Sequence, residues 1–224
     1  MEIVRSIMKS IVVTSFSWFL ALAVLSVTVG TVVAQSASDT GLSVETTYLK
    51  NIRQVTSGFV KAGEGYFSPD ATQIIYQAIT KDYPFYQIYT QPLAGGRPRM
   101  LSTGRGRTPC SYFSLDGKRI MYSSSHTDPQ MTETEQAEIK QQAEDRKNGV
   151  RRRYSWPFDP HTDMYVADLD GNILKRLTTA DGYDAEGAYS SDGKWIAFCS
   201  TRDGDPDLYI MKSNGRKVRQ LTNA

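Results

Sequence analysis

Three stretches of the chain repeat one pattern of turn and strand. The pattern carries Ser and Asp, with Gly in two of the three copies, and it begins at Tyr66, Tyr112 and Ala188. A β-rich run, a strand that contains Tyr, and an ending with a basic residue, Leu and Ser or Thr follow each copy. The first spacing is 46 residues, and the second is 76 because it contains a polar insertion. A period of about 40 to 50 residues with four short strands is typical of β-propeller blades. The repeat therefore predicts an all-β protein in which neighbouring blades bury one another's faces.

Each repeat is expected to fold into four antiparallel strands. The Ser-Ser-Asp-Gly run at 190–193 favours a tight turn, because Asp bonds its own backbone and Gly tolerates positive φ. The predicted blades span about residues 58–103, 104–179 and 180–224, within a propeller region at 47–224. Their expected strands are Glu64–Phe67, Gln73–Ala78, Gln87–Gln91 and Arg99–Ser102, then Ser111–Phe113, Arg119–Ser123, Asp163–Asp168 and Lys175–Thr178, then Glu186–Ser190, Trp195–Ser200, Asp207–Lys212 and Lys217–Thr222.

The segment before the first blade also has the pattern of an outer strand. Residues 47–56 end in Arg-Gln-Val-Thr, and the outer strand of the third repeat ends in Arg-Gln-Leu-Thr. We therefore expect this segment to be the outer strand of a further blade.

The repeats resemble those of TolB-type β-propellers. The resemblance rests on Ser-Pro/x-Asp-Gly, Ile-Ala-Phe-x-Ser, Arg-Asp-Gly-x-x-Asp-Leu-Tyr-x-Met and Arg-Gln-Leu-Thr, and it covers residues 47–224. It departs from the family pattern at Ala71 and Leu115, where Gly and Pro are usual. The resemblance implies WD-like blades in a ring that usually has six of them. It also implies either a periplasmic scaffold of the Tol–Pal envelope system or the non-catalytic propeller of an exopeptidase or polysaccharide lyase.

Three blades make only part of such a ring, because closed propellers need at least four. The separate α/β domain that precedes the propeller in TolB has no trace in the sequence. Three alternatives stay open: a part of a longer propeller, half of a ring that a second copy completes in a homo-oligomer, or an open arc.

The N-terminus predicts export. Arg5 and Lys9 precede an uncharged run from Ser10 to Ala34, and the run ends in Val-x-Ala, a small-residue cleavage site. We interpret residues 1–34 as a signal peptide and residues 35–46 as a flexible lead-in. The alternative is an uncleaved membrane anchor. After cleavage no membrane span is expected, and the protein is placed in the periplasm or outside the cell.

The insertion at 126–160 is the largest departure from the repeat. Thr132 and Glu135 match a capping box, and residues 133–147 are expected to form a solvated helix. Three arginines (Arg151, Arg152 and Arg153) and Trp156 follow it. Guanidinium groups beside aromatic rings suit an anionic glycan, a phosphate or an acidic protein surface. The alternative is a loop whose aromatic residues fold onto the blade edge.

Two sets of carboxylates were considered as sites. Asp203, Asp205 and Asp207 alternate like calcium ligands, although a strand-to-strand turn explains them equally. No other cofactor is expected. Glu64 and Glu186 take matching places at the start of inner strands, where they can face a ligand in the central channel or simply solvate its mouth.

The sequence contains none of the common catalytic motifs. G-x-S-x-G, H-E-x-x-H, the P-loop and C-x-x-C are all missing, and the net charge of +2 does not favour a nucleic-acid partner. We therefore predict an exported, non-catalytic propeller that binds a protein or an envelope polymer. The alternative is the propeller portion of a larger secreted peptidase or polysaccharide lyase.

Overall fold

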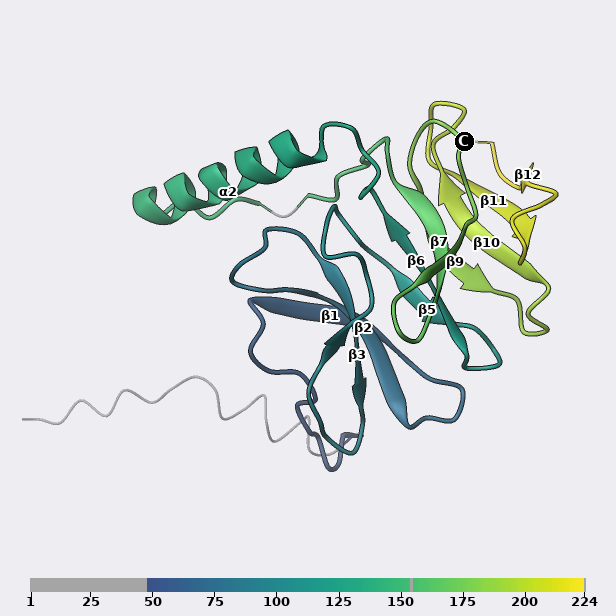
Figure 1. Ribbon diagram of the computed structural model, residues 1–224, viewed down its shortest axis with the longest axis horizontal. Helices are drawn as coiled ribbons and strands as arrows, with labels where there is room; N and C mark the ends of the chain where they lie inside the picture. The colour runs from purple at the N-terminus through teal and green to yellow at the C-terminus, as the bar shows by residue number, and fades with distance from the viewer. Residues whose placement is uncertain (1–47, 154, 224) are drawn as a thin grey trace, which may run out of the picture. The chain divides into compact units, whose positions relative to one another are not determined.

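The computed structural model describes residues 48–153 and 155–223 (Figure 1). Within these residues twelve strands form three four-stranded antiparallel sheets, and a long helix lies between two strands of the second sheet. The chain from Arg53 onwards forms one compact unit. The predicted signal peptide and lead-in lie outside the described residues. The strand order inside each sheet follows the chain, so every sheet is a simple meander from an inner to an outer strand.

The sheets are the three predicted blades, in the predicted order. The first contains β1 (Lys61–Phe67), β2 (Gln73–Ile79), β3 (Gln87–Pro92) and β4 (Arg99–Met100). The second contains β5 (Ser111–Phe113), β6 (Arg119–Ser124), β7 (Asp163–Asp168) and β8 (Ile173–Arg176). The third contains β9 (Asp184–Tyr189), β10 (Trp195–Ser200), β11 (Asp207–Lys212) and β12 (Arg219–Gln220). The prediction of a partial all-β propeller with a helical insertion in its second blade is confirmed.

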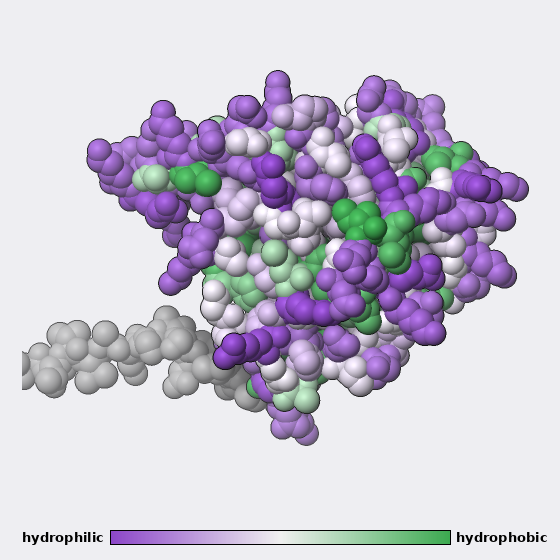
Figure 2. All heavy atoms as spheres, viewed as in Figure 1, coloured by the Kyte–Doolittle hydropathy of each residue, from purple (hydrophilic) through white to green (hydrophobic). Residues whose placement is uncertain are grey.

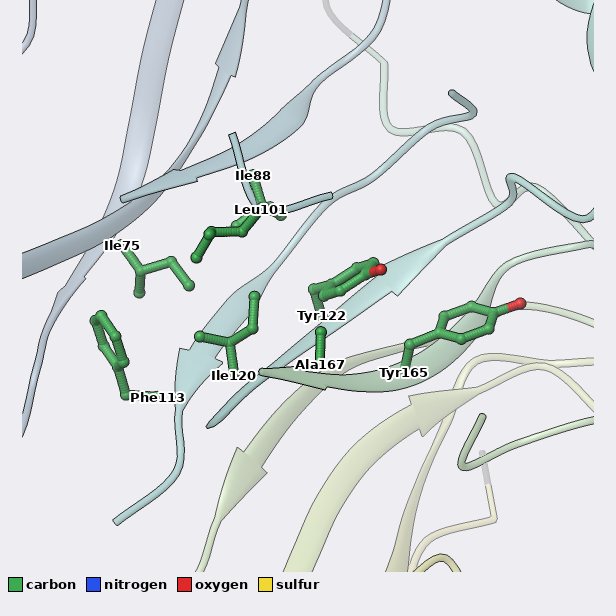
Figure 3. Packing of buried hydrophobic residues seen from close by; sticks show 8 residues of the cluster. All are labelled: Ile75, Ile88, Leu101, Phe113, Ile120, Tyr122, Tyr165 and Ala167. Atoms are coloured by element: carbon green, nitrogen blue, oxygen red, sulfur yellow. The ribbon is translucent and has the colours of Figure 1, made fainter. Parts of the chain in front are cut away.

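Apolar side chains of neighbouring blades interdigitate to form the core. Between the first two blades, Ile75, Ile88 and Leu101 pack against side chains of the second sheet (Figure 3). A second cluster of the same kind joins the methionines Met121 and Met164 to the third sheet. These two apolar clusters are therefore buried between neighbouring sheets, as expected for blades that each have two apolar faces.

One cross-strand aromatic pair recurs on the same face of every blade. The paired residues are Tyr76 with Tyr89, Tyr122 with Tyr165, and Phe198 with Tyr209. In the second and third blades this face packs against the preceding blade. We call it the back face, and we call the opposite face of each blade its forward face.

The back face of the first blade is covered by the chain's own residues 53–60, and here one prediction is wrong. No strand forms at residues 48–60 of the described chain, although 47–56 were expected to be an outer strand. Phe59 lies edge-on to Tyr76 and Tyr89, with ring centroids 5.9 and 4.9 Å away. The Gln91 side-chain amide donates to the carbonyl of Val55 at 2.9 Å. The segment thus bonds to side chains on a sheet face instead of pairing with a strand edge.

The repeated Ser and Asp tie each inner hairpin together. The hydroxyls of Ser68, Ser114 and Ser190 donate to the carboxylate two residues later, at 2.6, 2.5 and 2.7 Å. Each hydroxyl also accepts the backbone N–H that starts the next strand, at 2.9 to 3.0 Å. The conserved spacing of the three copies is therefore explained by one local hydrogen-bond network that joins two strands.

This network predicts a loss of stability in acid. The serine hydrogen bond is the main cause that holds the pKa of Asp70, Asp116 and Asp192 below the ordinary value, to about 2 for Asp192. Carboxylates with a lowered pKa stabilise the folded state above the unfolded pKa, and this stabilisation is lost as pH falls through the folded pKa values. The thermal unfolding temperature should therefore fall steadily below about pH 4. Replacing Ser68, Ser114 and Ser190 together by Ala should flatten that slope. Equal slopes in the variant and the parent would contradict the assignment.

The helix α2 (Met131–Asn148) fills the insertion, but its predicted capping box is wrong. Gln130 takes the N-cap position without a side-chain hydrogen bond. The Glu135 carboxylate instead pairs with Arg105 at 2.9 Å and accepts the Tyr83 hydroxyl at 2.6 Å. The Glu135 carboxylate therefore bonds to Arg105 and Tyr83 in preference to the backbone N–H groups at the start of its own helix. Only Met131 of α2 is buried, and most of its other side chains are polar, so the helix is largely purple in Figure 2 apart from a small hydrophobic group.

Candidate functional site

The insertion and the blades line an open cavity of about 350 Å³, to which the third blade contributes Tyr183. Among the described residues, its wall contains four aromatic residues, Phe85, Tyr86, Trp156 and Tyr183, beside three prolines. Four cationic residues line it, against one carboxylate, that of Glu138; they are Lys61, Arg107, Arg152 and Arg153. A cavity of this size with an apolar wall and a few charged groups is typical of small-ligand sites.

Arg107 is the lining cation that stacks on an aromatic ring of the first blade. It belongs to the loop before β5, and its guanidinium carbon lies 3.9 Å from the centre of the Phe85 ring. Its ion pair with Asp159 is long, at 3.7 Å, and its side chain keeps about 30% of its surface exposed. Burial lowers the pKa of Arg107, and the charge of Asp159 opposes this effect. The group stays cationic at neutral pH because an arginine pKa begins near 12.5.

Arg152 is already paired with two carboxylates of the protein. It contacts Glu138 at 2.6 Å and Asp145 at 2.7 Å, and both carboxylates belong to α2. These contacts are the main cause of its raised pKa, the hydrogen bond to Glu138 first. Arg152 therefore fastens the returning chain to the helix and offers little to a ligand.

The other predicted residues of the insertion differ in position. Arg153 lines the cavity, and no ion pair joins it to another described residue. Arg151 is exposed and does not line the cavity. Trp156 is half-buried, and its indole N–H donates to the Tyr183 hydroxyl at 2.8 Å. The three arginines predicted from the sequence therefore have different positions. Arg153 lines the cavity, Arg152 is paired with the helix, and Arg151 lies outside the site.

The two matching carboxylates, Glu64 and Glu186, do come together, with Cys110 between them. Each of these three residues has positive φ (51°, 59° and 53°) and stands three residues before the end of an inner strand. The Glu64 carboxyl reaches solvent, yet crowding by neighbouring atoms desolvates it and raises its pKa; the Cys110 thiol bonds to it and opposes the rise, and the Glu186 charge adds to it. Burial raises the pKa of the Cys110 thiol, with further rises from the two carboxylates. The thiol is therefore protonated at neutral pH and unsuited to nucleophilic chemistry.

Two of the three aspartates of the expected calcium loop, Asp203 and Asp207, make protein contacts, whereas Asp205 is exposed. Asp207 accepts the Thr222 hydroxyl at 2.6 Å, and Asp203 and Asp207 both accept the Gln220 amide. Asp163 holds Thr178 in the same way in the second blade, and Gln87 holds Ser102 in the first. In all three blades a side chain of the third strand thus holds a hydroxyl in the outer-strand segment, and Asp207 has this role in the third blade. Within residues 48–153 and 155–223 no three His, Cys, Asp or Glu side chains are grouped as metal ligands.

The structure adds two residues that the sequence did not single out, Lys61 and Arg107. Both lie in blade segments, and both meet the insertion only after the blades have stacked. Their only signal in the sequence is a basic residue near the start of an inner strand. That signal is weak, since surface strands often begin with a charge.

The comparisons with known proteins support the fold. Residues 154–224 match the family model of the TolB beta propeller domain. The chain is similar to a TolB homolog of Chlorobium luteolum, with 26% identity over 139 residues, which cover 57% of this chain and 31% of that protein. It is also similar to the Tol-Pal system protein TolB of Desulfosudis oleivorans, with 40% identity over 52 residues, which cover 23% of this chain and 12% of that protein.

A solved structure gives the same result for the architecture. TolB from Acinetobacter baumannii superposes with a TM-score of 0.50 and 22% identity, over 73% of this chain and 32% of that one. The three sheets are therefore blades of a partial β-propeller. The predicted resemblance to TolB-type propeller repeats is confirmed.

This chain spans about a third or less of the length of the curated relatives that it matches. Among the described residues, no helix has the length and apolarity of a membrane span.

Proposed function

We propose that this chain is the propeller region of an exported, non-catalytic scaffold that binds a protein or an envelope polymer. The observation that carries the proposal is the cationic cavity between the insertion and the TolB-type blades. The name of one relative, a Tol-Pal system protein, supports a protein partner in the cell envelope. Propeller folds host many functions, so the site and not the fold decides the argument.

Capture from envelope extracts tests this proposal. The full chain is compared with a variant in which Arg151, Arg152 and Arg153 are replaced by Ser. A second variant replaces the exposed arginines Arg97, Arg216 and Arg219 by Ser, which removes the same charge elsewhere. We expect the first variant to lose at least tenfold of the captured partner, and the second to stay within twofold, with binding reproduced by the purified partner. Equal capture by all three proteins would exclude the insertion as the binding surface.

Completion of the ring by a second copy stays a prediction, and the structure adds a condition to it. The forward face of the third blade leaves Leu208 and Leu221 about half exposed, at 52% and 49%. Their counterparts in the first blade, Ile88 and Leu101, are fully buried against the next blade. The aromatic back face of blade one would fit this surface, but Phe59 covers it.

Phe59→Ala should therefore promote self-association. The variant exposes Tyr76 and Tyr89, so head-to-tail pairing with a second copy should give a concentration-dependent dimer, while the parent chain stays monomeric. Adding Leu208→Asp to the variant should abolish the dimer, because it places a charge on the receiving face. Sedimentation at several concentrations measures the masses. A Phe59→Ala protein that remains monomeric would argue against ring closure through these two faces.

A further inference from the structure

We infer that the cavity beside α2 binds a single carboxylate carried on one ring that can stack against an aromatic side chain. This rests on the proposed function, because it takes the cavity as a binding site, and it names the chemistry of the ligand. The carboxylate would pair with Arg107, and the ring would lie against Phe85 and Trp156.

The cations around the cavity do not have equal roles. Arg152 is saturated by two ion pairs, whereas no hydrogen bond joins the Arg107 side chain to another described residue. A guanidinium presents five N–H donors in a planar fork that matches a carboxylate. Phe85 holds that fork in place by stacking, so little side-chain entropy is lost when an anion binds. Arg107 is therefore the anchor, and Lys61 and Arg153 add attraction.

The remaining wall limits the ligand's size and favours a ring. A volume of about 350 Å³ lies at the lower end of ligand cavities, so it accepts one ring and not an extended chain. Glu138 lies in the wall, but its carboxylate is paired with Arg152 and leaves the Arg107 fork to a ligand. The aromatic wall favours a carboxylate joined to a ring over inorganic phosphate, which has no ring to stack. The ring can come from an acidic sugar or from an aromatic acid, since both share this chemistry.

Titration of the full chain with defined probes tests the inference. The probes are glucuronate and benzoate, with their neutral analogues glucose and benzyl alcohol, and inorganic phosphate. The readout is the NMR signal of the Trp156 indole N–H, which bonds to Tyr183 at the cavity wall and which Trp156→Phe identifies. We expect at least one carboxylate to bind tenfold or more tightly than its neutral analogue. Glucuronate alone would indicate the sugar source, and benzoate alone the aromatic source.

Variants separate this site from general attraction of anions. Arg107→Gln should weaken carboxylate binding at least tenfold, whereas Arg151→Gln, which removes the same charge outside the cavity, should stay within twofold. If Arg107→Gln fails to fold, the double variant Lys61→Gln, Arg153→Gln should weaken binding several-fold. Neutral analogues that bind equally well, tighter binding of phosphate, or equal losses in Arg107→Gln and Arg151→Gln would overturn the inference.

The two proposals fail in different ways. Carboxylate binding that depends on Arg107, together with unchanged capture of envelope partners by the triple-Ser variant, would support the cavity ligand and reject the scaffold role of the insertion. Loss of capture together with no carboxylate binding would support the scaffold role and reject the cavity ligand.

Discussion

Gly106→Ala is expected to destabilise the fold by about 2–4 kcal/mol, because it combines backbone strain with a clash that cannot relax. Gly106 has a φ of +76°, in the region that side chains rarely adopt. A Cβ there would lie 2.6 Å from the backbone nitrogen of His126 and 2.8 Å from its Cα. The Gly106 carbonyl also accepts the buried Gln87 amide at 2.8 Å, so the loop cannot move away without breaking a hydrogen bond.

Gly149 is a control that separates the steric clash from the backbone strain, because it has positive φ without a nearby atom. Gly149, at the end of α2, has a φ of +65° and open space around its Cα, so Gly149→Ala should cost only about 1 kcal/mol. Urea unfolding of both variants gives the comparison. Since Gly106 lies between Arg105 and Arg107, its variant should also lose carboxylate binding in the cavity. Equal free energies of unfolding for the two variants would mean that the loop yields easily.

Arg202→Met is expected to cost about 3 kcal/mol, because it leaves a buried charge without a partner. Its guanidinium contacts both oxygens of Asp184 at 2.9 Å, and the Asp184 side chain is fully buried. The same guanidinium stacks near the aromatic rings of Phe198 and Tyr209. Urea unfolding measures the loss.

Two further variants test the physical reason. The double variant Asp184→Leu, Arg202→Met should recover much of the lost stability, since apolar groups of similar size often replace a buried ion pair. Arg216→Met, at an exposed arginine, should stay within about 0.5 kcal/mol of the parent. A double variant that is as unstable as Arg202→Met would show that packing, and not the buried charge, dominates.

The candidate site was only half visible in the sequence. Arg153 and Trp156 were identified because they follow a helix inside an insertion, which is a local pattern. Arg107 and Lys61 were missed because their importance depends on neighbours more than 20 residues away in the chain. The capping box failed for the same reason, since Glu135 found stronger partners in Tyr83 and Arg105 than in its own helix.

The sequence by itself determined the blades. Strand alternation and the Ser–Asp turn act over a few residues, so β10 and β11 begin and end where the pattern predicts. Only the tertiary structure decided which surfaces meet: residues 53–60 cover the first back face, Glu64 and Glu186 approach Cys110, and the insertion closes over Arg107. The physical reason is the distance along the chain over which each kind of interaction acts. A hairpin turn is selected by its own hydrogen bonds, whereas contacts between blades depend on how whole sheets stack to bury their apolar faces.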